Sequence, residues 1–198
     1  MDKSEAIAID IILPVHGRTE LTKQSVDAIY SNTKAPFHLI VMDDSEASIR
    51  DGAFHAVDPT DTTKEYFEKL CKLPKYSNVT YYNSPTPFKT GNEFFNTGFT
   101  MCKYEYVATI MNSTRVEPDW ETAAIGIMKT SPKVGIIGFK NLFPHGVIES
   151  AGIKFQGHIP TDFGRDQPAQ RLNGIFEVEA VQWAFALLRL KAVKGVIE

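Results

Sequence analysis

The segment A-I-A-I-D-I-I-L-P-V-H-G-R, residues 6–18, decides the fold of this chain. Its part up to Pro14 is a nearly continuous apolar and largely β-branched run, which is typical of a parallel strand covered on both faces. A polar turn follows directly. Thr19 is placed to be the N-cap of a helix that runs to Asn32, because apolar and small side chains then recur at helical spacing.

A second apolar run, F-H-L-I-V-M at residues 37–42, predicts the next buried strand. A strand, a helix and a strand of this size imply a right-handed parallel crossover. The alternation continues and predicts helices at residues 64–73, 91–103 and from Pro118 onward, strands at residues 78–82, 106–111 and 134–139, and a strand pair or a strand entering a helix at residues 176–190. The apolar face of the helix after Pro118 is expected to hold Trp120, Ala123, Ala124, Ile127 and Met128.

The segments between these elements are polar. Residues 46–63 are expected to loop outward, and residues 140–174 to form short strands and functional loops. Alternating strands and helices predict an α/β fold with a mostly parallel central sheet flanked by helices.

Length and composition restrict the function. The 198 residues, 43% of them hydrophobic, suffice for one sizeable core but not comfortably for two domains. The net charge of -3 gives no electrostatic reason to expect a nucleic-acid partner. The start of the chain resembles neither a secretory signal nor a transmembrane segment, so we expect a cytoplasmic protein. Cys71 and Cys102 are isolated and are expected to be reduced thiols.

Ligands of α/β folds bind at the edge where the parallel strands end. The polar residues expected to gather at that edge are His16, Asp43, Asp44, Asn112 and Ser113. Asp43 is placed either to accept hydrogen bonds from a nucleobase or ribose or to cap the next turn, and the residues alone weigh these two roles about evenly. The turn at residues 14–18 suits backbone N–H contacts to a base or phosphate.

Several other chemistries lack their motifs. There is no G-x-S-x-G pattern for a hydrolase triad, and K-T-G-N at residues 89–92 lacks the upstream glycine of a phosphate-binding loop. The histidines at positions 38, 55, 145 and 158 are scattered without the spacing of metal ligands. His158 is the partial exception, because its loop also holds Asp162 and Arg165.

The order of the segments resembles family 2 glycosyltransferases, which are inverting enzymes with the Rossmann-like GT-A fold. The likeness is closest to the bacterial branch that builds surface polysaccharide by rhamnosyl-type transfer. The segments that carry it are I-D-I-I-L-P-V-H-G-R at residues 9–18, L-I-V-M-D-D-S at 39–45, F-F-N-T-G at 94–98, N-S-T-R-V-E-P-D-W at 112–120, V-G-I-I-G-F-K-N-L-F-P-H-G-V-I-E-S-A-G at 134–152, G-R-D-Q-P at 164–168 and V-E-A-V-Q-W-A-F-A-L-L-R at 178–189.

The resemblance implies a single GT-A domain over residues 1–198, with a nucleotide-binding half at 1–115 and an acceptor-side half at 116–198. It implies a nucleotide-diphosphate sugar as donor and inverting transfer to a glycan or lipid-linked acceptor, through which the protein would touch a membrane peripherally. The nucleotide-binding residues implied are Pro14, His16, Arg18, Asp43, Asp44 and Asn112. Those implied on the sugar or acceptor side are Ser113, His158, Arg165 and Trp183.

The chain departs from the family at the metal site. Met111, Asn112 and Ser113 occupy the place of the acidic triplet that holds a divalent ion, and a thioether and a hydroxyl are poor ligands for Mg²⁺ or Mn²⁺. We therefore expect Mn²⁺ or Mg²⁺ to be weakly bound or absent, with positive charge supplied by a side chain such as Lys89, Arg115 or Arg165.

The catalytic base is a second departure. The family's acidic segment that supplies this base follows the equivalent of residues 193–198, which leaves Asp119 and Glu149 as the candidates here. Asp119 is expected in the first turn of a helix, where a capping role is favoured.

The sequence is compatible with three functions. The first is a nucleotide-sugar-dependent glycosyltransferase. The second is a non-catalytic module with the same fold that binds a nucleotide-sugar or a glycan, or acts as a scaffold, and the missing acids favour it. The third, a nucleotidyltransferase, lacks the usual glycine-rich opening loop with a basic residue and ranks last.

Overall fold

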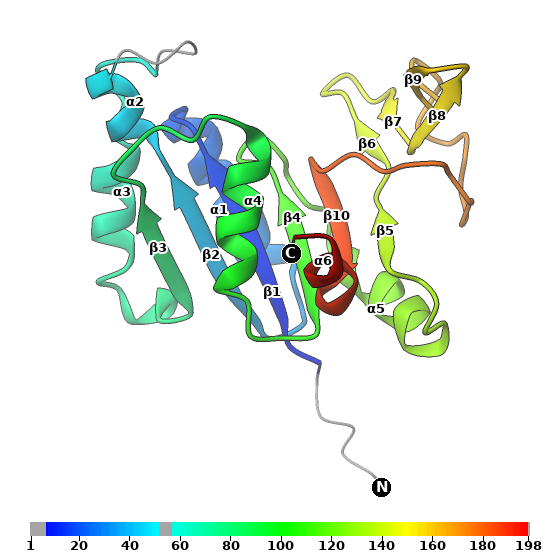
Figure 1. The fold of residues 1–198 in the computed structure, drawn as a ribbon, viewed down its shortest axis with the longest axis horizontal. Coiled ribbons are helices and arrows are strands. Elements are labelled where there is room, and N and C mark those ends of the chain that lie inside the picture. The colour runs from blue at the N-terminus through cyan, green and yellow to red at the C-terminus, as the bar shows by residue number, and fades with distance from the viewer. Residues whose placement is uncertain (1–6, 52–56, 198) are drawn as a thin grey trace, which may run out of the picture.

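A computed structural model describes residues 7–51 and 57–197 of the chain. The strands of its central sheet are β1 (Ile9–Val15), β2 (Phe37–Asp43), β3 (Val79–Asn83), β4 (Tyr106–Ile110), β5 (Ile136–Gly138) and β10 (Phe185–Arg189). They form one six-stranded sheet in the order β3-β2-β1-β4-β10-β5 (Figure 1). Strands β1 to β4 are parallel, and β10 runs antiparallel to both β4 and β5. The predicted α/β fold and parallel crossover are confirmed.

Helices cover both faces of this sheet. They are α1 (Thr19–Asn32), α2 (Ser45–Asp51), α3 (Thr63–Leu70), α4 (Gly91–Thr100), α5 (Trp120–Thr130) and α6 (Leu190–Ile197), with a short 3-10 turn at Pro74–Tyr76. Alternate residues of β1 face opposite sides, so Ile11 and Leu13 pack with α1, α3 and α5, whereas Ile12 packs with α4 and α6. Every residue of β1 is therefore buried, which explains its unbroken apolar run.

Three local expectations were wrong. Residues 46–63 do not form one loop, because α2 occupies Ser45–Asp51. The helix expected at residues 64–73 ends at Leu70. Helix α1 begins at Thr19 itself, and the N-cap position falls on Arg18 in a left-handed conformation with φ 61°. Ala6 and His55 lie outside the described residues, as do residues 52–56 of the expected loop.

The apolar face expected on α5 also differs from the observed one. The buried side chains of α5 are Trp120, Glu121, Ala124 and Met128. Ala123 is exposed and Ile127 only half-buried. Glu121 is buried because its Oε1 accepts hydrogen bonds from the backbone N–H groups of Lys34 and Ala35, at 2.7 and 2.8 Å.

The segment expected to hold short strands does so. It contains β6 (Asn141–Leu142), β7 (Ile148–Ser150), β8 (Ile153–Gln156) and β9 (Ile159–Asp162), which form two small antiparallel sheets beside the β5 edge (Figure 1). After it, β10 leads straight into α6, as one of the two alternatives predicted. No helix in the described part of the chain combines the length and apolar character needed to cross a bilayer.

Candidate functional site

Three loops meet where β1, β2 and β4 end. Val15 pairs with Asp43 at the last position of the β1–β2 ladder. The carboxamide of Asn112, just past β4, donates a hydrogen bond of 3.0 Å to the carbonyl of Gly17 in the loop after β1. The convergence of His16, Asp43 and Asn112 at this edge is therefore confirmed.

Gly17 is held from both sides. Its N–H donates to the Ser45 hydroxyl at 2.6 Å, and its carbonyl accepts from Asn112 and from the Thr22 hydroxyl, the latter at 3.3 Å. Its φ is 67°, and a Cβ built there would lie 2.6 Å from a methyl carbon of Val57. Glycine is thus required both by the left-handed backbone and by the close contact. These bonds fix the loop of residues 16–18 between β2 and β4.

Asp43 belongs to the hydrogen-bond network that fixes the loop of residues 16–18. It is fully buried, its Oδ1 accepts hydrogen bonds from the backbone N–H and the hydroxyl of Ser45, and its Oδ2 accepts one of 2.7 Å from Tyr81. Burial raises the pKa of Asp43 in spite of these hydrogen bonds. The geometry shows Asp43 in the turn-forming role, because it binds the backbone N–H and hydroxyl of Ser45. Through Ser45 it holds Gly17 in place.

Asp44 orients His16. The buried carboxylate of Asp44 contacts His16 Nδ1 through Oδ1 at 2.7 Å and accepts the Phe88 backbone N–H through Oδ2 at 2.9 Å. The His16 side chain is 36% exposed, so part of its ring faces solvent. Pro14, by contrast, is buried in β1.

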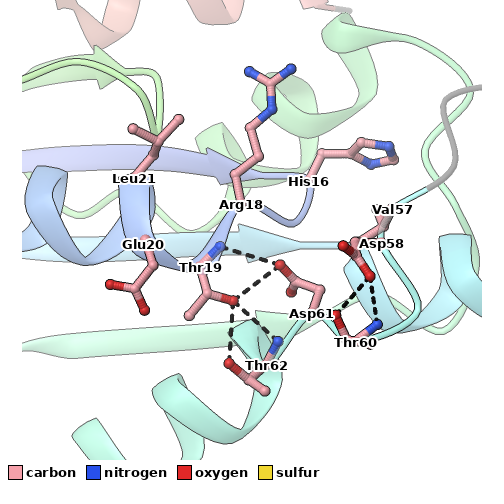
Figure 2. Close-up of a pocket in the computed structure, with 10 residues that line it drawn as sticks. All are labelled: His16, Arg18, Thr19, Glu20, Leu21, Val57, Asp58, Thr60, Asp61 and Thr62. Atoms are coloured by element: carbon pink, nitrogen blue, oxygen red, sulfur yellow. Dashed lines mark hydrogen bonds between the residues drawn. The ribbon is translucent and has the colours of Figure 1, made fainter.

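A cavity of about 720 Å³ opens beside the loop of residues 16–18. Figure 2 shows its lining residues, which are His16, Arg18, Thr19, Glu20, Leu21, Val57, Asp58, Thr60, Asp61 and Thr62. The side chain of Arg18 is exposed and extends away from the Thr19–Asp61 contacts (Figure 2).

Asp61 forms one wall of the cavity and joins two helices. Its Oδ2 accepts the backbone N–H and the hydroxyl of Thr19 at 3.2 and 3.0 Å, and its Oδ1 accepts the Thr63 N–H at 2.9 Å. It thereby caps the first turns of both α1 and α3. Burial disfavours its ionised form, but the hydrogen bonds from Thr63 and Thr19 outweigh burial and lower the pKa of Asp61.

Residues 111–113 do not fit a divalent cation. Met111 is half-buried, Ser113 is exposed, and the amide nitrogen of Asn112 donates to Gly17 and Thr22. Over residues 7–51 and 57–197, no group of three or more His, Cys, Asp or Glu side chains is arranged to hold a metal ion. This donor set lacks the charged oxygens that Mn²⁺ and Mg²⁺ prefer.

Both base candidates lie outside the cavity. The Asp119 carboxylate pairs with Lys34 at 2.7 Å, and its backbone N–H donates to the carbonyl of Asn32 at the end of α1. Asp119 therefore lies at the opposite edge of the sheet, where β2 begins. It occupies the N-cap position of α5 without a side-chain capping bond, so the expected capping role was wrong. Glu149 belongs to β7, in the lobe beside β5.

The residues implied on the sugar or acceptor side are dispersed as well. His158 is exposed in the turn of the β8–β9 hairpin. Arg165 pairs with Asp162 at 3.0 Å and lies over the Phe143 ring. Trp183 stacks on Phe95 of α4, with ring centroids 5.3 Å apart, and does not line the cavity beside residues 16–18.

The sequence alone did not indicate the roles of Ser45, Asp61 and Thr22. Asp61 precedes a helix by two residues, which is a capping signal that could have been recognised. Its second contact, to Thr19, spans 42 positions and leaves no local trace.

Neither a scan against protein-family models nor a search of curated proteins gives a match. Solved structures do match. The mannosyltransferase PcManGT from Pyrobaculum calidifontis, in complex with GDP-Man and Mn²⁺, has a TM-score of 0.61 and 14% identity over 98% of this chain and 48% of that chain. S. aureus TarS 1-349 with UDP has a TM-score of 0.59 and 11% identity over 96% and 49%.

A third structure, S. aureus TarS 1-349 with UDP-GlcNAc, has a TM-score of 0.54 and 16% identity over 71% of this chain and 37% of that chain. The chain thus spans about half the length of these glycosyltransferases or less. At such identities the similarity concerns the fold, and the fold of this chain is the GT-A glycosyltransferase fold.

Proposed function

We propose that this chain binds the nucleoside part of a nucleotide-diphosphate sugar in the cavity beside residues 16–18. The observation that carries the proposal is the position of this cavity of about 720 Å³, at the edge where the parallel strands end. Solved structures with the same fold are complexes with GDP-Man, UDP or UDP-GlcNAc. All lining residues belong to residues 1–115, the half expected to bind the nucleotide.

The charges of the cavity favour a nucleoside over a phosphate in its interior. The carboxylates of Glu20, Asp58 and Asp61 line it, against one guanidinium, that of Arg18. These carboxylates repel phosphate oxygens, and those with an unused lone pair accept hydrogen bonds from base N–H groups and ribose hydroxyls. The diphosphate therefore lies outside the part of the cavity that these carboxylates line. It lies near the exposed guanidinium of Arg18, which forms charge-assisted hydrogen bonds with phosphate.

Five of the six predicted nucleotide-binding residues divide into two groups under this proposal, and the sixth, Pro14, is buried in β1. His16 and Arg18 contact the ligand. The other group positions the loop and does not contact the ligand. It consists of Asp43, Asp44 and Asn112, which form hydrogen bonds with Ser45, His16 and the Gly17 carbonyl, respectively.

The reaction class that we propose is sugar transfer with inversion to a glycan or lipid-linked hydroxyl. The acceptor oxygen attacks the anomeric carbon opposite the diphosphate, and the bond between the sugar and the phosphate breaks. The nucleoside diphosphate leaves with the bonding electrons, and the hydroxyl proton passes to a base. The chain's own contribution is to bind and orient the donor and to place a cation near the leaving group. No step is assigned to a metal, since the residues at positions 111–113 do not fit one.

A second candidate function is a binding module without transfer activity. The hydrogen bonds of Asn112 favour it, because the amide that stands in place of a metal acid serves to hold the loop. Release of free sugar or glycosylated acceptor from a bound donor distinguishes the two functions. We expect the isolated chain to bind the nucleotide with little turnover, because general-base assistance alone is commonly worth about 10²- to 10⁴-fold.

Calorimetric titration of the chain with UDP, dTDP and GDP, each with Mn²⁺ and with EDTA, tests the binding proposal. We expect at least one nucleotide to bind with an affinity that Mn²⁺ does not change. Arg18→Ala should weaken this binding by about tenfold, the equivalent of one charge-assisted contact.

Arg171→Ala, which removes an exposed arginine from the lobe at residues 140–180, is the matched control and should bind normally. The proposal fails if no nucleotide binds, or if Arg18→Ala and Arg171→Ala behave alike.

A further inference from the structure

A second cavity lies between α4 and α6, on the face of the sheet opposite α1, α3 and α5. It has a volume of about 560 Å³, and it shares no lining residue with the cavity beside residues 16–18. Its walls are built from α4, the start of β5, β10 with the residue Trp183 before it, and the first turn of α6. Figure 1 shows α4 and α6 together in front of the sheet. We call this cavity the α4–α6 groove.

The groove combines an aromatic wall with two carboxamides. The Trp183 ring is 41% exposed and is backed by Phe95 and Phe99, with centroid distances of 5.3 and 6.2 Å. Asn92 and Asn96 lie one helical turn apart on the exposed side of α4 and both line the groove. Neither carboxamide forms a hydrogen bond to any other group in the described part of the chain.

The charge of the groove restricts its occupant. Among its lining residues, all of them described, there is no acidic, basic or histidine side chain. A phosphate, a nucleotide or a charged peptide would lose its hydration there without gaining a partner. A purely apolar occupant would bury the two carboxamides without hydrogen bonds, at a cost for each. A neutral molecule with both apolar faces and hydroxyl groups meets neither penalty.

We propose that the α4–α6 groove is a binding site for a neutral glycan chain. The C–H face of a pyranose ring lies on the Trp183 indole. The Asn92 and Asn96 carboxamides, each with two donors and an acceptor oxygen, exchange hydrogen bonds with ring hydroxyls. Phe95 and Phe99 hold the indole in place. The site goes beyond the proposed nucleotide cavity and does not depend on it.

The test uses neutral oligosaccharides without any nucleotide. Maltohexaose, mannotetraose and chitotetraose are added to the chain in EDTA, and saturation-transfer NMR and tryptophan fluorescence are followed. At least one of them should bind with a dissociation constant on the order of 1 mM, typical of a small hydrogen-bonded ligand. Because Trp120 is only 8% exposed, the fluorescence change should come from Trp183.

Variants separate the aromatic contribution from the polar one. Trp183→Ala should weaken glycan binding by about tenfold or more, Trp183→Phe should retain most of it by NMR, and Tyr104→Ala, at another exposed aromatic residue, should not change it. The double substitution Asn92→Leu with Asn96→Leu should lower glycan affinity by about tenfold while it increases binding of the apolar dye anilinonaphthalene sulfonate.

Gln170→Leu, at an exposed carboxamide outside the groove, is the control for that pair. If none of the three oligosaccharides binds up to tens of millimolar, the proposal is overturned. It is overturned as well if binding survives both sets of groove variants, or if only the dye binds to the groove. None of these outcomes affects nucleotide titration, which reports on the cavity beside residues 16–18.

Discussion

Asn112 holds the loop of residues 16–18 through its side-chain amide. Its amide nitrogen lies 3.0 Å from both the Gly17 carbonyl and the Thr22 hydroxyl, in buried surroundings. A carboxylate cannot donate to a carbonyl oxygen, so an acid at this position would leave Gly17 without one donor and place two oxygen acceptors together. The loop anchor therefore requires an amide where metal binding would require an acid.

Asn112→Asp should accordingly destabilise the chain by about 1–3 kcal/mol, the usual cost of leaving a buried polar group unsatisfied. Urea unfolding measures this change. Ser113→Asp, at the neighbouring exposed position, is the control and should stay within about 0.5 kcal/mol of the wild type. An Asn112→Asp variant of full stability that gained Mn²⁺-dependent nucleotide affinity would contradict this role.

At the scale of elements, Asp61 connects the beginnings of α1 and α3. Neither helix has a side-chain capping bond from its own N-cap residue, and Asp61 supplies acceptors to Thr19 at one and Thr63 at the other. A helix start without an acceptor leaves backbone N–H groups unpaired. One carboxylate thus holds two elements beside the cavity.

Asp61→Ala should reduce the free energy of unfolding at pH 7 by about 1–2 kcal/mol, the range for loss of a capping residue. The folded-state pKa of Asp61 is lowered, so its stabilisation is present above its ordinary value of 3.8 and is lost as the pH falls through the folded-state pKa. The difference between wild type and variant should therefore shrink below about pH 4 in urea unfolding curves. A difference that stays constant down to pH 2 would show that the charge of Asp61 is not responsible.

The packing of α4 on β1 depends on Gly98. A Cβ built on Gly98 would lie 2.9 Å from the Cγ2 methyl of Ile12, whereas one on Gly126 of α5 would meet nothing within 4 Å. Gly98→Ala should destabilise by about 1–3 kcal/mol through overpacking, and Gly126→Ala should stabilise by up to about 1 kcal/mol through helix propensity. Thermal unfolding of the two variants compares the same chemical change in two environments. Equal shifts would argue against close packing at Gly98.

At the scale of the whole molecule, one central sheet carries two cavities of different charge. The cavity beside residues 16–18 is lined by acids and one arginine, and the α4–α6 groove by uncharged side chains. The sheet that carries both is continuous, since β10 pairs with β4 and β5. A ligand that binds only the folded chain therefore stabilises the whole sheet.

A nucleotide present at about 100 times its dissociation constant should stabilise the chain by about 2.7 kcal/mol. This corresponds to a rise in Tm of roughly 5–10 °C for a domain of this size. Differential scanning calorimetry should give the same shift in EDTA as in Mn²⁺, because the residues at positions 111–113 do not fit a metal. A shift confined to Mn²⁺ would mean that a carboxylate elsewhere binds the ion.

The sequence by itself determined the fold class, the parallel crossover and the edge at which the polar loops meet. These follow from apolar runs and their spacing, which are local patterns with a direct physical meaning. The register of the short strands at residues 141–162 and the extent of α2 were not predictable in this way, because polar segments carry little periodicity.

Only the tertiary structure decided what each polar residue at that edge does. Asp43 was an even choice between ligand contact and turn formation until Ser45 and Tyr81 were seen to occupy both of its oxygens. Asp119 lies at the edge of the sheet where β2 begins, and its carboxylate pairs there with Lys34, which is 85 positions away in the sequence. Hydrogen bonds between residues distant in sequence leave no periodic signal, so the division between ligand contacts and loop anchors depends on the folded chain.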